Sequence, residues 1–136
     1  MSSTTSNIKI RILVVDDEPD ILLGLNAHLT SQGHCVKTFD KPAQALEHLR
    51  SGVVLYYLVI TDYRMPGGMS GLDLAKQVKD RTRETKVFLM TAFDVSSLTE
   101  FSEAVNLGMV DETIQKPIPN DKLIAIIEKN FLHNNH

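Results

Sequence analysis

Acidic residues follow two apolar segments of this chain, and carboxylates placed in that way can do metal and phosphoryl chemistry. Asp16 and Asp17 come directly after segment 11–15, and Asp62 follows segment 58–61. If the two segments are neighbouring parallel strands, three carboxylates meet at one carboxyl-end edge of a sheet. Two unit charges about 4 Å apart repel by roughly 4 kcal/mol at an effective dielectric of about 20, so the cluster needs a compensating cation, a lysine or both. Such a site can bind Mg²⁺ and offer one carboxylate as a nucleophile to a phosphoryl group.

The elements that must position these carboxylates alternate between strand-like and helix-like patterns. The apolar residues predict strands over 8–15, 35–39, 54–61, 86–91 and 111–115, separated and followed by segments with helical spacing. Asp40 and Asn120 are the expected N-caps of the second and last helices. Cys35, in the second strand, is expected to be a core residue.

Strands alternating with helices predict an α/β domain with a doubly wound, five-stranded parallel sheet. In the flavodoxin-like order 2-1-3-4-5, ligands bind at the carboxyl ends of strands one and three, where the strand order reverses. Asp16, Asp17 and Asp62 follow those strands, while Thr91 and Lys116 end strands four and five. Lys116 can place a positive charge on one phosphoryl oxygen, and the Thr91 hydroxyl can donate a hydrogen bond to another.

Composition limits the classes of function. The chain has 136 residues, 43% of them hydrophobic, and a net charge of −3, so it fits one globular domain without the positive field that nucleic acid or an anionic membrane would attract. The longest apolar run, 53–60, is too short to span a bilayer, and residues 1–7 lack the features of a secretion signal. A single cysteine excludes an internal disulfide. We expect a cytoplasmic domain over residues 8–132, between a flexible N-terminal tail (1–7) and a C-terminal tail (133–136).

Four motifs in order, Val14–Pro19, Thr61–Pro66, Met90–Ala92 and Lys116–Pro117, resemble those of the receiver domains of two-component response regulators, including the chemotaxis regulators. The resemblance extends over residues 8–131, nearly the whole chain. It implies the receiver fold and a signalling switch rather than an enzyme that turns over a substrate. The phosphoryl donor would be a phosphohistidine on a sensor histidine kinase or a histidine phosphotransfer protein.

The resemblance also implies a magnesium site. Asp62 would be the phosphoacceptor and, with Asp17 and the backbone carbonyl of Arg64, would ligate Mg²⁺ directly. Asp16 would act through a metal-bound water.

Two further residues would take part in the response to phosphorylation. Thr91 would move toward the phosphoryl group and Lys116 would pair with it. The Lys116–Pro117 peptide is often cis in this family.

The chain departs from the family pattern in places. The loop 65–71 is one residue longer than usual, and Thr113 stands where receivers carry the aromatic residue that moves on activation. Arg64 and Phe93 occupy positions that line the path of the attacking water, so we expect a long-lived phosphorylated form.

Two alternatives remain open at this stage. One is a degenerate receiver that serves as a phosphate-independent dimerisation or docking module, which Thr113 keeps possible. The other is a phosphohydrolase with Asp16 as its nucleophile, although the usual Asp-x-Asp spacing is absent. No output domain is expected after the last helix, so a stand-alone receiver, monomeric or weakly dimeric, would act by contact with an unknown downstream protein.

Overall fold

Strands and helices alternate through the residues that this computed structural model describes, which are 8–65, 68–92 and 99–132. The strands are β1 (Arg11–Val15), β2 (Cys35–Phe39), β3 (Leu58–Asp62), β4 (Lys86–Thr91) and β5 (Glu112–Gln115). The helices are α1 (Pro19–Ser31), α2 (Pro42–Ser51), α3 (Gly71–Arg81), α4 (Thr99–Asn106) and α5 (Asn120–Phe131).

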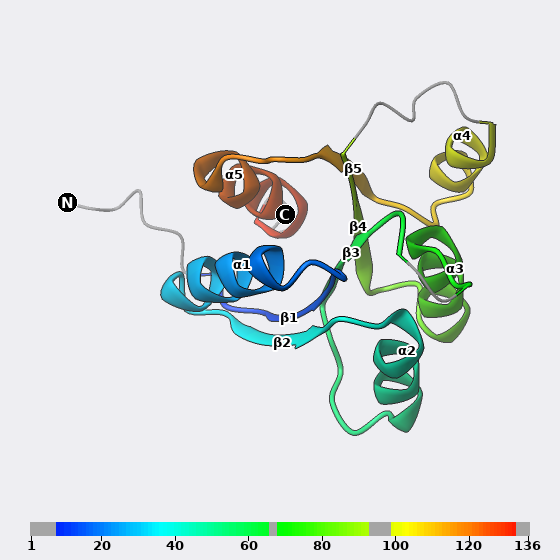
Figure 1. Ribbon diagram of the computed structural model, residues 1–136, viewed down its shortest axis with the longest axis horizontal. Coiled ribbons are helices and arrows are strands. Elements are labelled where there is room, and N and C mark those ends of the chain that lie inside the picture. The colour runs from blue at the N-terminus through cyan, green and yellow to red at the C-terminus, as the bar shows by residue number, and fades with distance from the viewer. Residues whose placement is uncertain (1–7, 66–67, 93–98, 133–136) are drawn as a thin grey trace.

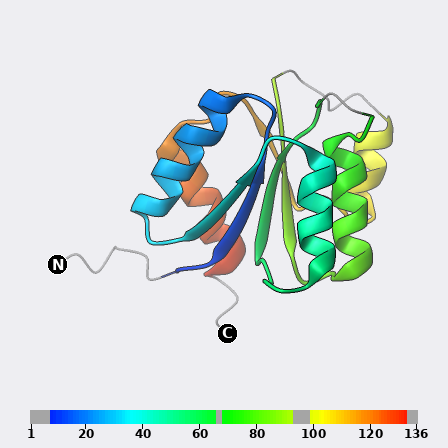
Figure 2. The same cartoon turned by 60° about the horizontal axis from the view of Figure 1, so that its bottom comes forward.

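The strands form one parallel sheet in the order β2-β1-β3-β4-β5, which confirms the predicted doubly wound α/β class. Helices α1 and α5 cover one face, while α2, α3 and α4 cover the other (Figures 1 and 2). The order reverses between β1 and β3, so the crevice expected in such sheets lies where these two strands end.

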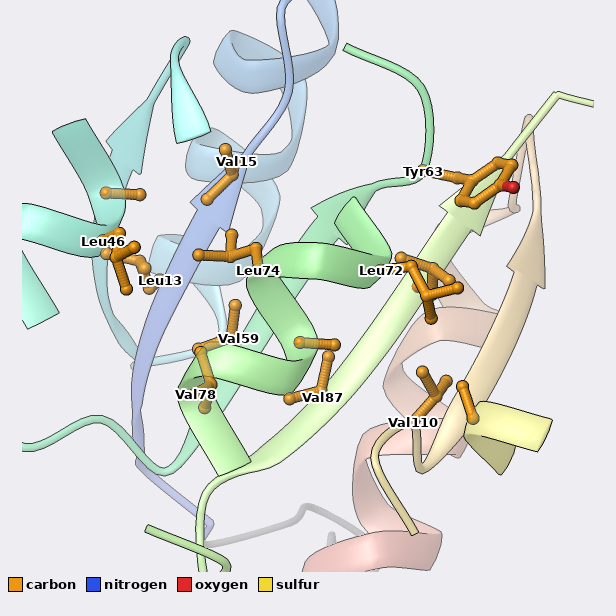
Figure 3. Close-up of a cluster of buried hydrophobic side chains, with 14 of the residues drawn as sticks. Leu13, Val15, Leu46, Val59, Tyr63, Leu72, Leu74, Val78, Val87 and Val110 are labelled. Carbon is orange, nitrogen blue, oxygen red and sulfur yellow. The ribbon is translucent and has the colours of Figure 1, made fainter. Parts of the chain in front are cut away.

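Successive side chains of the central strands point to opposite faces of the sheet and contribute to two separate hydrophobic cores. Leu13, Val59 and Val87 pack under α2, α3 and α4, as Figure 3 shows for the cluster on that face. The intervening residues, such as Val14 and Ile60, pack against α1 and α5. All five of these side chains are completely buried, so the central strands are held on both faces and their ends are fixed in space.

Helix starts differ from the sequence expectation in two places. The N-cap of α2 is Lys41 rather than Asp40, and α5 begins at Asn120 after the N-cap Pro119; neither cap makes a side-chain hydrogen bond. Helix α3 instead has a reciprocal capping box between Ser70 and Asp73.

The third strand begins later than its apolar run suggested. Backbone pairing with β1 starts at Leu58 rather than Val54, and the preceding residues Val53 and Leu55 are 82% and 69% exposed. The cause is that α2 ends at the left-handed Gly52, and the chain must then cross the amino-terminal edge of the sheet before it can pair. Cys35 was also wrongly expected in the core: it is exposed because β2 is an edge strand.

Within the described residues, none of the helices has the length and apolar character needed to cross a membrane.

Candidate functional site

Three carboxylates converge at the carboxyl-end edge of the sheet, as predicted. Val15 lies opposite Thr61 in the ladder between β1 and β3, so Asp16 and Asp62 leave the sheet side by side. One carboxylate oxygen from each of Asp16, Asp17 and Asp62 lies within 4.8 Å of the other two. Asp16 is fully buried and Asp62 is only 7% exposed, while Asp17 is the most exposed of the three.

Lys116 supplies the positive charge that this cluster requires. Its Nζ lies 2.8 Å from Asp16 Oδ2 and 3.2 Å from Asp62 Oδ1. A third contact, 3.0 Å to Glu18 Oε1, brings another carboxylate into the group. The peptide bond between Lys116 and Pro117 is cis, as the family pattern implied.

The environment favours protonation of the buried carboxylates. Burial and the charge of Asp16 raise the pKa of Asp62 to about 6, against the opposing effect of Lys116. Burial likewise raises the pKa of Asp16, although Lys116 and the Glu18 backbone N–H act to lower it. For Lys116, burial lowers the pKa, but its hydrogen bonds and ion pairs with Asp16, Glu18 and Asp62 outweigh burial, and the net shift is upward. One ammonium therefore does not fully compensate the acidic group.

The donor atoms fit a hard divalent cation. Asp16 Oδ1 accepts the backbone N–H of Glu18 at 2.9 Å. Asp16 Oδ2 is buried and has no hydrogen-bond partner of good geometry among the described residues; its contact is the ion pair with Lys116. An excess of carboxylate oxygens with unused lone pairs is the donor set that Mg²⁺ prefers.

The other predicted site residues lie at the same edge. Thr91 is the last residue of β4, is 5% exposed, and its carbonyl accepts the backbone N–H of Lys116 at 2.7 Å. Arg64 follows β3, with its guanidinium 5.9 Å from the centre of the Tyr63 ring. Phe93 lies outside the described residues. The structure thus brings Asp16, Asp17, Asp62, Thr91 and Lys116 to one end of the sheet, while their individual roles remain predictions.

Sequence reasoning missed three residues that shape this edge. Glu18 was overlooked as a partner of Lys116, although it directly follows the acidic pair. A Cβ on Gly71 would lie 2.0 Å from the Asp62 carbonyl oxygen, so only glycine fits at the start of α3. Tyr63 donates a hydrogen bond from its hydroxyl to Glu100 Oε2 on α4. Only the first had a signal in the sequence, because the other two depend on packing between distant segments.

Fold and site together define a doubly wound α/β domain with a carboxylate cluster at its topological switch point. Comparison with known proteins agrees: residues 12–128 match the family model for the response regulator receiver domain. The chain therefore belongs to the receiver-domain family, whose members are signalling modules rather than classical enzymes.

Individual relatives support the same assignment. The chain is 35% identical over 122 residues to the DNA-binding transcriptional regulator NtrC of Escherichia coli strain K12, covering 90% of this chain and 25% of that protein. It is 34% identical over 118 residues to the transcriptional regulatory protein DltR of Streptococcus agalactiae serotype III, covering 87% of this chain and 50% of that protein. It thus spans between a quarter and a half of the length of these curated relatives.

A solved structure resembles the whole domain. The response regulator TrrA of Thermotoga maritima, crystallised in complex with Mg²⁺ and BeF, superimposes with a TM-score of 0.75 at 33% identity. The match covers 88% of this chain and 96% of that one.

Proposed function

We propose that this chain is a phosphoacceptor switch that takes a phosphoryl group onto Asp62 with the help of Mg²⁺. The observation that carries the proposal is the convergence of Asp16, Asp17 and Asp62 around one point, with Lys116 only 3.2 Å from Asp62 Oδ1. A carboxylate nucleophile beside a lysine and an acidic metal site is the constellation that phosphoryl transfer to a carboxylate requires.

In the proposed reaction, an Asp62 carboxylate oxygen bonds to phosphorus as the bond from phosphorus to the donor histidine nitrogen breaks. That nitrogen keeps the electron pair, and the ring, already protonated on its other nitrogen, leaves as neutral imidazole. Asp62 must be ionised to attack, and the positive charge of Lys116 lowers its pKa against burial and the nearby Asp16. Hydrolysis of the phosphorylated Asp62 requires a water molecule to reach the same phosphorus atom.

Asp17, Asp62 and the backbone carbonyl of Arg64 are the proposed direct ligands of Mg²⁺, with Asp16 acting through a bound water. The ion, when bound, would neutralise charge on the carboxylates and on the incoming phosphoryl oxygens. The oxygens of Asp16 support this assignment, because Oδ2 has Lys116 as its ion-pair partner and keeps a lone pair for a metal-bound water. The response regulator TrrA, which is 33% identical, was crystallised in complex with Mg²⁺ and BeF, and this supports the proposed magnesium site.

The remaining roles follow from placement at the same edge. Lys116 would shift from Asp16 toward a phosphoryl oxygen, and the hydroxyl of Thr91 would donate a hydrogen bond to another. Arg64, close to Asp62, would hinder water, so the proposal includes slow loss of the phosphate. Loss within seconds from the purified protein would contradict that part.

A sensor histidine kinase or a histidine phosphotransfer protein is the proposed donor, and the proposed output is contact of a monomer or weak dimer with a downstream protein. The proposed location is the cytoplasm, which the lone Cys35 supports. A phosphate-independent docking module is the second candidate, because Thr113 on β5 is exposed and is not the aromatic residue usual at this position.

The decisive measurement is the intact mass after incubation with acetyl phosphate and Mg²⁺. We expect one added phosphoryl group on the wild type, none on Asp62→Ala, and an unchanged gain on the control Asp80→Asn, which alters an exposed carboxylate of α3. Beryllofluoride with Mg²⁺ separates the two candidates, because a docking module would show no change of its amide spectrum. Phosphorylation of Asp62→Ala would overturn the assignment of the acceptor.

A further inference from the structure

The loop between α2 and β3 exposes an apolar surface that the phosphoacceptor role does not explain. Val53, Leu55 and Tyr57 are 82%, 69% and 48% exposed, whereas the alternating residues Val54 and Tyr56 point inward. This loop contains the first part of the longest apolar run in the sequence. Three exposed large apolar side chains within five residues are unusual on a surface that stays in water.

The loop is held firmly rather than lying loose on the domain. The Tyr56 hydroxyl is 2.7 Å from His48 Nε2, and the Tyr56 carbonyl accepts the Thr85 hydroxyl at 2.8 Å. Just before the strand register begins, the Tyr57 N–H donates to the Arg11 carbonyl and the Tyr57 carbonyl accepts the Lys86 N–H, each at 3.0 Å. The apolar side chains are therefore presented in a fixed arrangement, which lowers the entropic cost of binding a partner.

Two adjoining hollows lie beside these side chains and share Leu55, Tyr56, Thr82 and Thr85. The smaller has a volume of about 110 Å³ and the larger about 360 Å³. We call these hollows and the loop the amino-edge groove; its remaining lining residues are Leu49, Gly52, Val54, Tyr57, Val78, Arg81, Glu84 and Phe131. Their sizes suit individual apolar side chains of a bound segment.

Two arginines and one glutamate, Glu84, border the amino-edge groove, so its rim carries a net positive charge. Arg11 Nε donates to the Leu55 carbonyl at 2.8 Å with its guanidinium 5.6 Å from the Tyr57 ring centre, and Arg81 donates to the Arg50 carbonyl at 3.2 Å. Among the described residues, neither Arg11 nor Arg81 forms an ion pair with a carboxylate. In a chain of net charge −3, these two arginines outnumber Glu84 at the rim and make a local positive field.

We propose that the amino-edge groove docks an acidic segment of another protein that carries apolar side chains between its carboxylates. The apolar residues would enter the two hollows, and the carboxylates would pair with Arg11 and Arg81, for which the planar guanidinium offers paired donors. A groove-to-groove contact with a second copy of this chain would bring two surfaces of the same positive charge together, which disfavours that occupant. The hollowed shape favours a peptide, whose side chains can enter the hollows, over the broad surface of an anionic membrane.

The amino-edge groove lies at the opposite end of the sheet from the carboxylate cluster. Leu58 begins β3 directly after the groove, and Asp62 ends the strand, a rise of about 13 Å at roughly 3.3 Å per residue. The two sites share no residue, so a partner can occupy the groove while Asp62 reacts. The inference does not depend on the phosphoacceptor role.

The test is a nuclear magnetic resonance titration of the full chain with three synthetic peptides of equal length. One is rich in aspartate and glutamate with two leucines, the second replaces its acidic residues by lysine, and the third replaces its leucines by serine. We expect amide shifts at residues 49–57 and 81–85 with the first peptide alone. No shift there with the acidic peptide, or an equal response to the lysine peptide, would overturn the proposal.

Variants sharpen the result. Leu55→Ser and Arg81→Glu should each weaken binding of the acidic peptide by about tenfold, and the lysine peptide should bind Arg81→Glu better than wild type. Both substituted side chains are exposed, so folding should survive. The matched controls are Leu107→Ser and Lys122→Glu, exposed positions outside the groove, which should leave binding unchanged. Equal weakening by the controls, a Leu55-dependent dimer in sedimentation, or tighter binding to phosphatidylserine vesicles than to the acidic peptide would each overturn the proposal.

Discussion

Lys116 bridges the two buried carboxylates of the site: its Nζ is 2.8 Å from Asp16 Oδ2 and 3.2 Å from Asp62 Oδ1. The ammonium that is proposed to pair with a phosphoryl group is therefore already engaged with Asp62, the proposed nucleophile, and with its neighbour Asp16. Because Asp16 is fully buried, water screens its ion pair with Lys116 only weakly. The lysine thus compensates buried negative charge in the folded protein, in addition to its proposed role toward a phosphoryl group.

Replacing Lys116 by methionine keeps most of the length of the side chain and removes its charge. We expect the free energy of unfolding to fall by about 2–4 kcal/mol without divalent cations, because carboxylates remain buried without their counter-charge. Added Mg²⁺ should recover part of that loss, so the variant should gain more stability from the ion than the wild type does. Urea denaturation with and without Mg²⁺ measures both quantities.

Lys129→Met is the matched control. Lys129 pairs with Glu112 at 2.8 Å, but its side chain is 64% exposed, so we expect a change of only about 0–1 kcal/mol and no altered response to Mg²⁺. An equal loss in both variants would mean that the burial of the Lys116 pair has no energetic consequence.

The carboxylate cluster could be predicted from the sequence because its positions follow from strand ends alone. Apolar residues run up to Asp16 and Asp62, and parallel strands buried on both faces must end at one edge. The same logic placed Thr91 and Lys116. No side-chain geometry was needed for any of these predictions.

The predictions that were wrong concerned residues whose burial depends on the path of the chain rather than on residue type. Val53 and Leu55 are apolar but exposed, because the left-handed Gly52 directs the chain across the sheet edge before pairing begins at Leu58. Cys35 lies on an edge strand, which a single sequence does not reveal. The close approach of Gly71 to the Asp62 carbonyl could not be predicted either, because no periodic pattern in the sequence relates these two residues.

Gly71→Ala tests that close approach. A Cβ there would lie 2.0 Å from the Asp62 carbonyl oxygen and 2.9 Å from Leu89 Cδ1, so the start of α3 or the end of β3 must shift. We expect a loss of about 2 kcal/mol or more in unfolding free energy and weaker Mg²⁺ binding, measured by thermal melting with and without the ion. Gly24→Ala is the control: it lies inside α1 with nothing within 4 Å, and alanine should stabilise that helix by up to about 1 kcal/mol. A Gly71→Ala protein as stable as Gly24→Ala would contradict the packing argument.

His34 should make stability depend on pH. Burial, with Lys9 and His28 nearby, lowers its pKa, and its Nδ1 lies 3.2 Å from the Ile10 backbone N–H, which it accepts only when neutral. The unfolded chain therefore binds more protons at this residue once the pH falls below about 6.5. The stability that His34 contributes is complete above that pH and is lost as the pH falls toward the lowered pKa. Other groups titrate in this range, so the measured quantity is the difference between wild type and His34→Gln in urea denaturation from pH 7.5 to 5. A difference that does not change with pH would contradict the assignment.

The last prediction concerns Tyr63, which joins the residue after Asp62 to α4. Its hydroxyl donates to Glu100, and its ring packs edge-on against Phe101 with centroids 5.6 Å apart. Tyr63→Phe keeps the ring and leaves the Glu100 carboxylate to water, so we expect a loss of about 1 kcal/mol and faster hydrogen exchange across α4. Thr113→Ala, at an exposed position of β5, should leave exchange in α4 unchanged. If Thr113→Ala increased hydrogen exchange in α4 as much as Tyr63→Phe does, the contact between Tyr63 and Glu100 would not be what holds α4 in place. The prediction would then be wrong.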